Sequence, residues 1–176
     1  MSPLNIAFVG GGIMAEALVS GILQARLGAP EDIAISEPIE ARRSYLEQTY
    51  KVRPVGRNLE VVEDADIVVL AVKPQSLPGV MSELKDGLQS NHAVMSIVAG
   101  ATMTTLMDGL GHSAVIRVMP NTPARIGAGM SVWTASPDVQ QEKVSAVRDI
   151  LRTLGEELYV SDEKLIDMST ALSASG

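Results

Sequence analysis

The chain has 176 residues, of which 46% are hydrophobic and 20% charged, a composition typical of a globular domain with a full core. The formal net charge of −7, without a basic cluster longer than Arg42-Arg43, argues against a nucleic-acid partner, and the absence of cysteine excludes disulfides and thiolate chemistry. No apolar run approaches the roughly 18 residues that span a bilayer, and the N-terminus shows no leader pattern, so we expect a cytoplasmic protein without a membrane segment.

A short apolar run, Leu4 to Val9, is followed directly by Gly10-Gly11-Gly12-Ile13-Met14-Ala15. A buried strand, a Gly-x-Gly-x-x-Ala turn and a helical pattern present backbone N–H groups and a helix N-terminus to the diphosphate of a dinucleotide. Gly10 permits the tight turn, and Gly12 removes the Cβ that would collide with the diphosphate. This pattern predicts a dinucleotide site, and a glycine-rich turn without a ligand is the alternative.

Strands and helices then alternate along the chain. The repeated strand, turn and helix units predict right-handed crossovers and a mostly parallel, doubly wound α/β sheet of the Rossmann type. Strands are expected at 33–35, 52–55, 67–72, 93–98 and 114–118, and helices at 14–25, 39–50, 75–89 and 102–110.

The last third begins with a candidate strand, Met130 to Thr134. Ser136 and Pro137 then predict a helix start, with Ser136 as N-cap and Pro137 at the first helical position. Further expected features are a buried stripe of Val144, Val147, Leu151 and Leu154, a stop at Gly155, a closing strand at 158–160, and a helix from Asp162 with Leu165, Met168 and Leu172 on one face. We therefore expect a dinucleotide-binding domain over 1–161 and the start of a helical domain over 162–176, whose remainder the sequence does not contain.

Three further loops follow predicted strands. The carboxyl ends of parallel strands meet at one edge of a doubly wound sheet, which is where ligands bind. The loops are Ala71-Val72-Lys73-Pro74-Gln75, Ser96-Ile97-Val98-Ala99-Gly100-Ala101-Thr102 and Met119-Pro120-Asn121-Thr122-Pro123.

Together with the glycine turn and the closing Ala171-Leu172-Ser173-Ala174-Ser175-Gly176, these loops resemble pyrroline-5-carboxylate reductase. The resemblance runs over essentially the whole chain, and its most specific parts are the Met-Pro-Asn-Thr-Pro and Val-Lys-Pro segments. Ala174 stands where that family has the first glycine of a Leu-Ser-Gly-Ser-Gly stretch. The family's later proline-alanine-aromatic and Ser-Pro-Gly-Gly-Thr segments are not in this sequence. The resemblance implies that the substrate half lies in the absent helical domain, and that a homodimer or larger homo-oligomer forms through it.

The resemblance also implies which positions hold a nicotinamide dinucleotide. The diphosphate is expected to contact Gly10, Gly12, Ile13 and Met14, and the riboses are expected to contact Ala71, Val72, Lys73 and Pro74. The adenosine end is assigned to Asn58. The nicotinamide is assigned to Ala99, Gly100, Asn121, Thr122 and Pro123. For each of them, ordinary strand-end turn chemistry is the alternative. No catalytic residue and no metal ligand is expected in this chain.

The choice between NADH and NADPH depends on the end of the second predicted strand. Glu37 can accept hydrogen bonds from the adenosine ribose hydroxyls and repel a 2′-phosphate, which favours NADH. Ser36, Arg42 and Arg43 can instead hold that phosphate, and the resembled family commonly accepts NADPH. The sequence leaves this choice open.

The reaction that the resemblance implies is hydride transfer from the reduced cofactor to the cyclic imine 1-pyrroline-5-carboxylate, giving L-proline. A protonated imine is already a good electrophile, so the protein mainly has to bind and orient two rings. One alternative is another two-domain NAD(P)-dependent dehydrogenase of the hydroxyacid or prephenate type, in which the loop Met119–Pro123 is not expected. A non-catalytic nucleotide-sensing module is the other.

We expect His92 and His112 to be solvated or to cap loops, and Arg117 to be structural.

Overall fold

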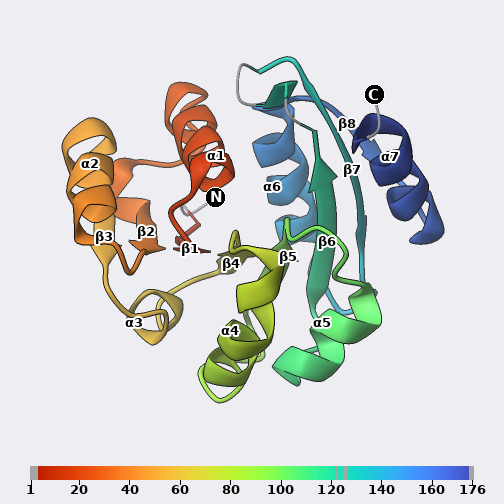
Figure 1. Cartoon of the computed structure of the whole chain (residues 1–176), viewed down its shortest axis with the longest axis horizontal. Helices are drawn as coiled ribbons and strands as arrows, with labels where there is room; N and C mark the ends of the chain where they lie inside the picture. The colour runs from red at the N-terminus through yellow and green to blue at the C-terminus, as the bar shows by residue number, and fades with distance from the viewer. Residues whose placement is uncertain (1–3, 122, 125–126, 175–176) are drawn as a thin grey trace.

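The structure is a computed structural model of the chain, and it describes residues 4–121, 123–124 and 127–174. These residues form an eight-stranded sheet in the order β3-β2-β1-β4-β5-β6-β7-β8, in which all neighbours run parallel except β6 and β7 (Figure 1). The strands are β1 Ile6–Val9, β2 Ile33–Ser36, β3 Arg53–Val55, β4 Ile67–Leu70, β5 Ala93–Ser96, β6 Val115–Pro120, β7 Gly129–Ala135 and β8 Gly155–Tyr159. The prediction of a mostly parallel α/β sheet is confirmed.

Helices cover both faces of the sheet, with α1, α2 and α6 on one side and α3, α4 and α5 on the other (Figure 1). Successive residues of one strand therefore enter different cores: Phe8 of β1 packs against the first group and Val9 against the second. This double burial is why the central strands are continuously apolar. The helices are α1 Ile13–Gln24, α2 Glu40–Tyr50, α3 Leu59–Val62, α4 Leu77–Leu84, α5 Met103–Leu110, α6 Gln141–Arg152 and α7 Lys164–Ala174, with short 3-10 turns at Pro30–Asp32 and Pro74–Ser76.

The predicted start of α6 is wrong. The helix begins at Gln141 and not at Pro137. The Ser136 hydroxyl donates to the carbonyl oxygen of Ser113 at 2.6 Å and accepts from the backbone N–H of Val115 at 3.0 Å. It is thus used to join the end of β7 to the start of β6, and it does not cap a helix.

The four-residue helix α3 was not predicted, because a single turn is too short to show helical periodicity. Pro54 lies within β3 as the sequence indicated, and it is tolerated there because β3 is an edge strand.

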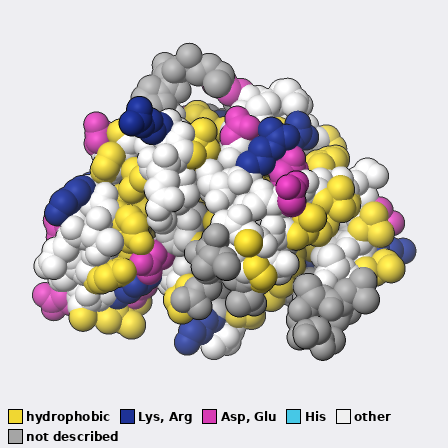
Figure 2. All heavy atoms as spheres, turned by 90° about the horizontal axis from the view of Figure 1, so that it is seen from above, with side chains coloured by type: hydrophobic (Ala, Val, Ile, Leu, Met, Phe, Trp, Pro, Cys, Tyr) yellow, Lys and Arg dark blue, Asp and Glu magenta, His cyan; other side chains and the backbone are white. Residues whose placement is uncertain are grey.

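The last helix, α7, packs on the sheet beside β6 and β7 through Ile166, which is buried with Val132 and Val160. The face that the sequence singled out is exposed at Leu165 and Met168, and the side chain of Leu172 lies outside the described residues. Figure 2 shows hydrophobic side chains gathered at the end of the molecule that carries β8 and α7. Among the described residues no helix is long and apolar enough to cross a bilayer.

Candidate functional site

A cleft of ≈ 530 Å³ lies at the carboxyl ends of β1, β2 and β4. It brings together the glycine turn, the loop after β2 and the loop after β4. Its lining residues are Gly10, Gly11, Gly12, Ile13, Glu37, Pro38, Ile39, Arg42, Ala71, Val72, Lys73 and Ser76. A larger hollow of ≈ 730 Å³ lies beside Leu27 and Pro30 after the far end of α1, but no helix of eight residues or more begins there to offer backbone donors.

The glycine turn has the shape that an anion cradle requires. Gly10 has φ +100°, and a Cβ on it would lie 2.6 Å from the carbonyl oxygen of Ala71. A Cβ on Gly12 would have no atom within 4 Å, so the space in front of this residue is open. Gly12 also precedes α1 without a side-chain cap, and the N–H groups of Ile13 and Met14 have no acceptor in the part of the chain that the structure describes. Open space beside free helical donors fits a diphosphate.

Glu37, at the end of β2, is buried beside this turn. One carboxylate oxygen accepts from the backbone N–H of Gly11 at 3.1 Å, and the other accepts from the N–H of Ile39 at 3.0 Å. The side chain lines the cleft, but both of its oxygens already serve backbone donors. Its first role is to fasten the glycine turn to the start of α2.

The two arginines of α2 are also bound to backbone carbonyls. Arg42 donates from Nε to the carbonyl oxygen of Gly11 at 2.7 Å and from Nη2 to that of Gly12 at 3.3 Å. Arg43 donates to the carbonyl oxygens of Glu37 and Pro38 at 2.7 and 2.8 Å. Only Arg42 is among the residues that line the cleft.

Glu16, in the first turn of α1, was missed by the sequence reasoning. Its Oε2 forms an ion pair with Arg42 at 2.5 Å, and its Oε1 accepts from the hydroxyls of Tyr45 and Tyr50, each at 2.8 Å. Burial by itself would raise the pKa of Glu16, but the hydrogen bonds from Arg42 and the two tyrosines outweigh it and lower that pKa. Burial and the hydrogen bond to Glu16 raise the pKa of Tyr50 to about 12.

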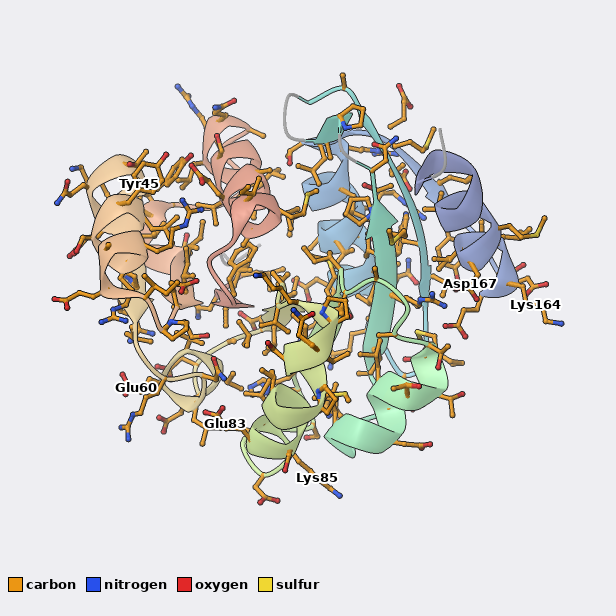
Figure 3. All side chains as sticks on the ribbon, in the orientation of Figure 1. Tyr45, Glu60, Glu83, Lys85, Lys164 and Asp167 are labelled. Carbon is orange, nitrogen blue, oxygen red and sulfur yellow. The ribbon has the colours of Figure 1, made fainter. Side chains whose placement is uncertain are left out.

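A second polar chain lies on the other side of β2. The Ser36 hydroxyl donates to Oδ1 of Asn58 at 2.7 Å, and Nδ2 of Asn58 donates to Glu83 at 2.8 Å. Glu83 comes from α4 and lies near α3 in Figure 3. Ser36 and Asn58 are thus brought together beside the cleft, although neither is among its lining residues.

The remaining predicted positions divide into two groups. Ala71, Val72 and Lys73 line the cleft, and Pro74 starts the short turn that follows. The positions assigned to the nicotinamide are not among the lining residues. Of these, Ala99, Gly100 and Pro123 are exposed, Asn121 accepts from the Met130 N–H at 2.9 Å, and Thr122 lies outside the described residues.

Neither histidine lies in the cleft. His92 is 1% exposed, so it is not solvated; its Nδ1 accepts from the backbone N–H of Gln89 at 3.1 Å, which is a loop-capping role. Nε2 of His112 lies 2.9 Å from the carbonyl oxygen of His92. Burial, followed by the charge of Lys143, lowers the pKa of His92. The described residues contain no cluster of three or more potential metal ligands.

Arg117 is a buried member of an ion-pair cluster, which agrees with the structural role expected for it from the sequence. Its guanidinium binds Glu163 at 2.6 Å and Asp167 at 2.5 Å, and Glu163 also accepts from the backbone N–H of Met103. Through Asp167 one arginine of β6 therefore ties α7 to the sheet, and Glu163, directly before α7, binds the start of α5.

Comparison with known proteins places similarity along the whole chain. Residues 5–100 match the family model described as NADP oxidoreductase, coenzyme F420-dependent. The chain is 38% identical over 173 residues to a pyrroline-5-carboxylate reductase of Synechocystis sp., covering 98% of the chain and 64% of that relative.

Two solved structures share this fold closely. The pyrroline-5-carboxylate reductase of Coxiella burnetii has a TM-score of 0.94 at 32% identity, covering 99% of this chain and 65% of that one. The pyrroline carboxylate reductase of Plasmodium falciparum with NADP bound has a TM-score of 0.85 at 28% identity, covering 100% and 64%. The chain thus spans slightly less than two thirds of the length of these relatives.

Proposed function

Since this chain belongs to the family of NADP oxidoreductases described as coenzyme F420-dependent, we propose that it is the cofactor-binding part of a pyrroline-5-carboxylate reductase. The observation that carries the proposal is the open space at Gly12 beside the free N–H groups of Ile13 and Met14, in a chain 38% identical to such a reductase. In this proposal residues 1–161 bind the dinucleotide and 162–176 begin a helical domain that completes the substrate site and joins subunits. The relatives are longer than this chain, which spans slightly less than two thirds of their length, and this supports the division.

In this proposal the cleft itself takes the diphosphate and the riboses, and residues outside its lining take the two ends of the cofactor. The N–H groups of Ile13 and Met14 would hold the diphosphate, and the loop 71–74 would line the riboses. Asn58 holds the adenosine end. The nicotinamide end is assigned to Ala99 and Gly100, together with Asn121, Thr122 and Pro123. These roles are supported by the position of the loops at the carboxyl ends of parallel strands, the edge of such a sheet at which ligands bind.

The chemistry asked of this part of the protein is binding and orientation. The reduced nicotinamide, when bound, supplies the hydride that reduces the C=N bond of 1-pyrroline-5-carboxylate to give L-proline. The chain's own residues fix the diphosphate and riboses, which holds the nicotinamide ring at the edge where the imine is presented. The small-molecule substrate is bound mainly by the helical domain.

The cofactor is NADPH or NADH, and the structure favours neither. Each side chain that the sequence suggested for the choice already bonds to the protein. Glu37 accepts from backbone N–H groups, Arg43 donates to backbone carbonyls, and Ser36 donates to Asn58.

Titration of the chain with NADH and NADPH, followed by cofactor fluorescence, tests the proposal. We expect saturable binding of both and little or no reductase activity from the 176-residue chain alone. Absence of binding would refute the proposal. When the chain is assayed within a protein of the relatives' length, turnover of pyrroline-5-carboxylate supports the reductase. Turnover of hydroxyacids or prephenate would identify the alternative dehydrogenase class, and binding without any turnover would identify a nucleotide sensor.

A further inference from the structure

The first turn of α1 carries a negative charge close to the N-terminus at which the diphosphate is proposed to bind. Glu16 lies one helical turn after Gly12, and its backbone N–H donates to the Gly12 carbonyl at 3.0 Å. A carboxylate near a helix N-terminus is favoured by the helix dipole. A cofactor diphosphate bound at the same N-terminus would, however, be repelled by that carboxylate. The charge of Glu16 therefore needs compensation before the turn can bind a diphosphate well.

Arg42 lies between this carboxylate and the cleft. It pairs with Glu16 at 2.5 Å, and the two side chains are only 25% and 20% exposed. The same guanidinium donates to the carbonyl oxygens of Gly11 and Gly12, so it joins the carboxylate to the glycine turn itself. The ring of Tyr45, which Figure 3 labels on α2, has its centroid 5.0 Å from the guanidinium carbon of Arg42. Tyr45 and Tyr50 occupy the other oxygen of Glu16.

Three donors on one carboxylate keep it ionised, so its charge is balanced by a partner and is not removed by protonation. The contacts of Arg42 do not favour one cofactor over the other. Its Nε and Nη2 bind the glycine turn and Glu16. The turn is proposed to bind the diphosphate, a group that NADH and NADPH share.

Resting on the function proposed above, we propose that Arg42 is a positioning residue for the cofactor diphosphate. It neutralises Glu16 and holds the carbonyls of Gly11 and Gly12, so that the N–H groups at the start of α1 meet an anion without repulsion. It therefore sets the affinity for NADH and NADPH alike and does not choose between them.

A charge-compensation cycle tests this inference without any assay of turnover. The variants Arg42→Met, Glu16→Gln and the double variant are titrated calorimetrically with NADH, NADPH and ADP-ribose. We expect Arg42→Met to weaken all three by roughly ten- to a hundredfold, because the carboxylate of Glu16, one helical turn from Gly12, then repels the diphosphate without a compensating charge. The double variant recovers at least roughly tenfold of that loss, since neither charge remains.

Two further variants keep the result interpretable. Arg42→Lys retains the positive charge and folds with the least disturbance, and its affinities are expected to stay within roughly fivefold of wild type. Arg152→Met removes the ion pairs of Arg152 with Asp149 and Glu157, away from the cleft, and is expected to leave all three affinities unchanged.

Several outcomes would overturn the inference. A loss confined to NADPH would make Arg42 a reader of the 2′-phosphate. A double variant as weak as Arg42→Met, or an Arg42→Met protein that binds like wild type, would remove charge compensation as the cause. If wild type binds none of the three nucleotides, the proposed function fails and this inference fails with it; if wild type binds and only the cycle fails, the proposed function stands.

Discussion

The carboxylate of Glu37 accepts a hydrogen bond from the backbone N–H of Gly11 at 3.1 Å, across 26 positions of sequence. This bond connects the end of β2 to the glycine turn after β1, two of the segments that border the cleft. Glu37, which the sequence suggested as a reader of the adenosine ribose, is therefore also a support of the glycine turn.

Replacement of Glu37 by Ala leaves the N–H groups of Gly11 and Ile39 without their acceptor. We expect the free energy of unfolding in urea to fall by about 1–3 kcal/mol, the cost of unsatisfied buried donors. Binding of NADH and NADPH is expected to weaken together because the turn loosens. A large gain in NADPH affinity in this variant would instead show that the carboxylate repels the 2′-phosphate.

Gly12→Ala separates cofactor binding from stability. The added methyl group meets no protein atom within 4 Å, so the free energy of unfolding should change by less than about 1 kcal/mol. The methyl group does enter the space proposed for the diphosphate, and we expect the affinity for NADH to fall by roughly tenfold or more, or about 1.4 kcal/mol. Gly79→Ala, at another open position, is the control and should bind like wild type.

Removing the two carboxylates that bind Arg117 should destabilise the protein more than removing Arg117 itself. In Glu163→Gln/Asp167→Asn, a cation that is only 4% exposed loses both countercharges, and we expect a loss of about 2–3 kcal/mol. In Arg117→Met the two carboxylates, 30% and 58% exposed, can rehydrate, so the loss should be smaller. Urea unfolding measures both. The reverse order would mean that the arginine contributes mainly through packing.

Glu16 should make stability depend on pH in the acid range. Its pKa in the folded chain lies below the ordinary value of 4.5, so its stabilising contribution is complete above pH 4.5 and is lost as the pH falls through the folded value. Glu16→Gln removes this contribution, and the difference in unfolding free energy between wild type and variant should shrink below pH 4.5. A constant difference from pH 7 to 3 would contradict the lowered pKa.

The sequence was sufficient for most of the secondary structure because strands buried on both faces must be apolar along their whole length. Residues 67–70 show this pattern, and the glycine turn marks the helix that follows β1. The pattern was insufficient at Ser136, where a good capping residue is used in a tertiary hydrogen bond, and at α3, where one turn leaves no periodic signal.

The candidate site divides in the same way. The sequence by itself determined a strand, turn and helix suited to an anion, and it placed the loops 71–74 and 96–102 at the same edge of the sheet, because both properties follow from local patterns and from parallel topology. Only the tertiary structure decided which polar groups are free to meet a ligand. Glu16, Glu37 and Arg42 find partners 26 to 34 positions away, and hydrogen bonds over such separations are set by how helices pack, which no local pattern encodes.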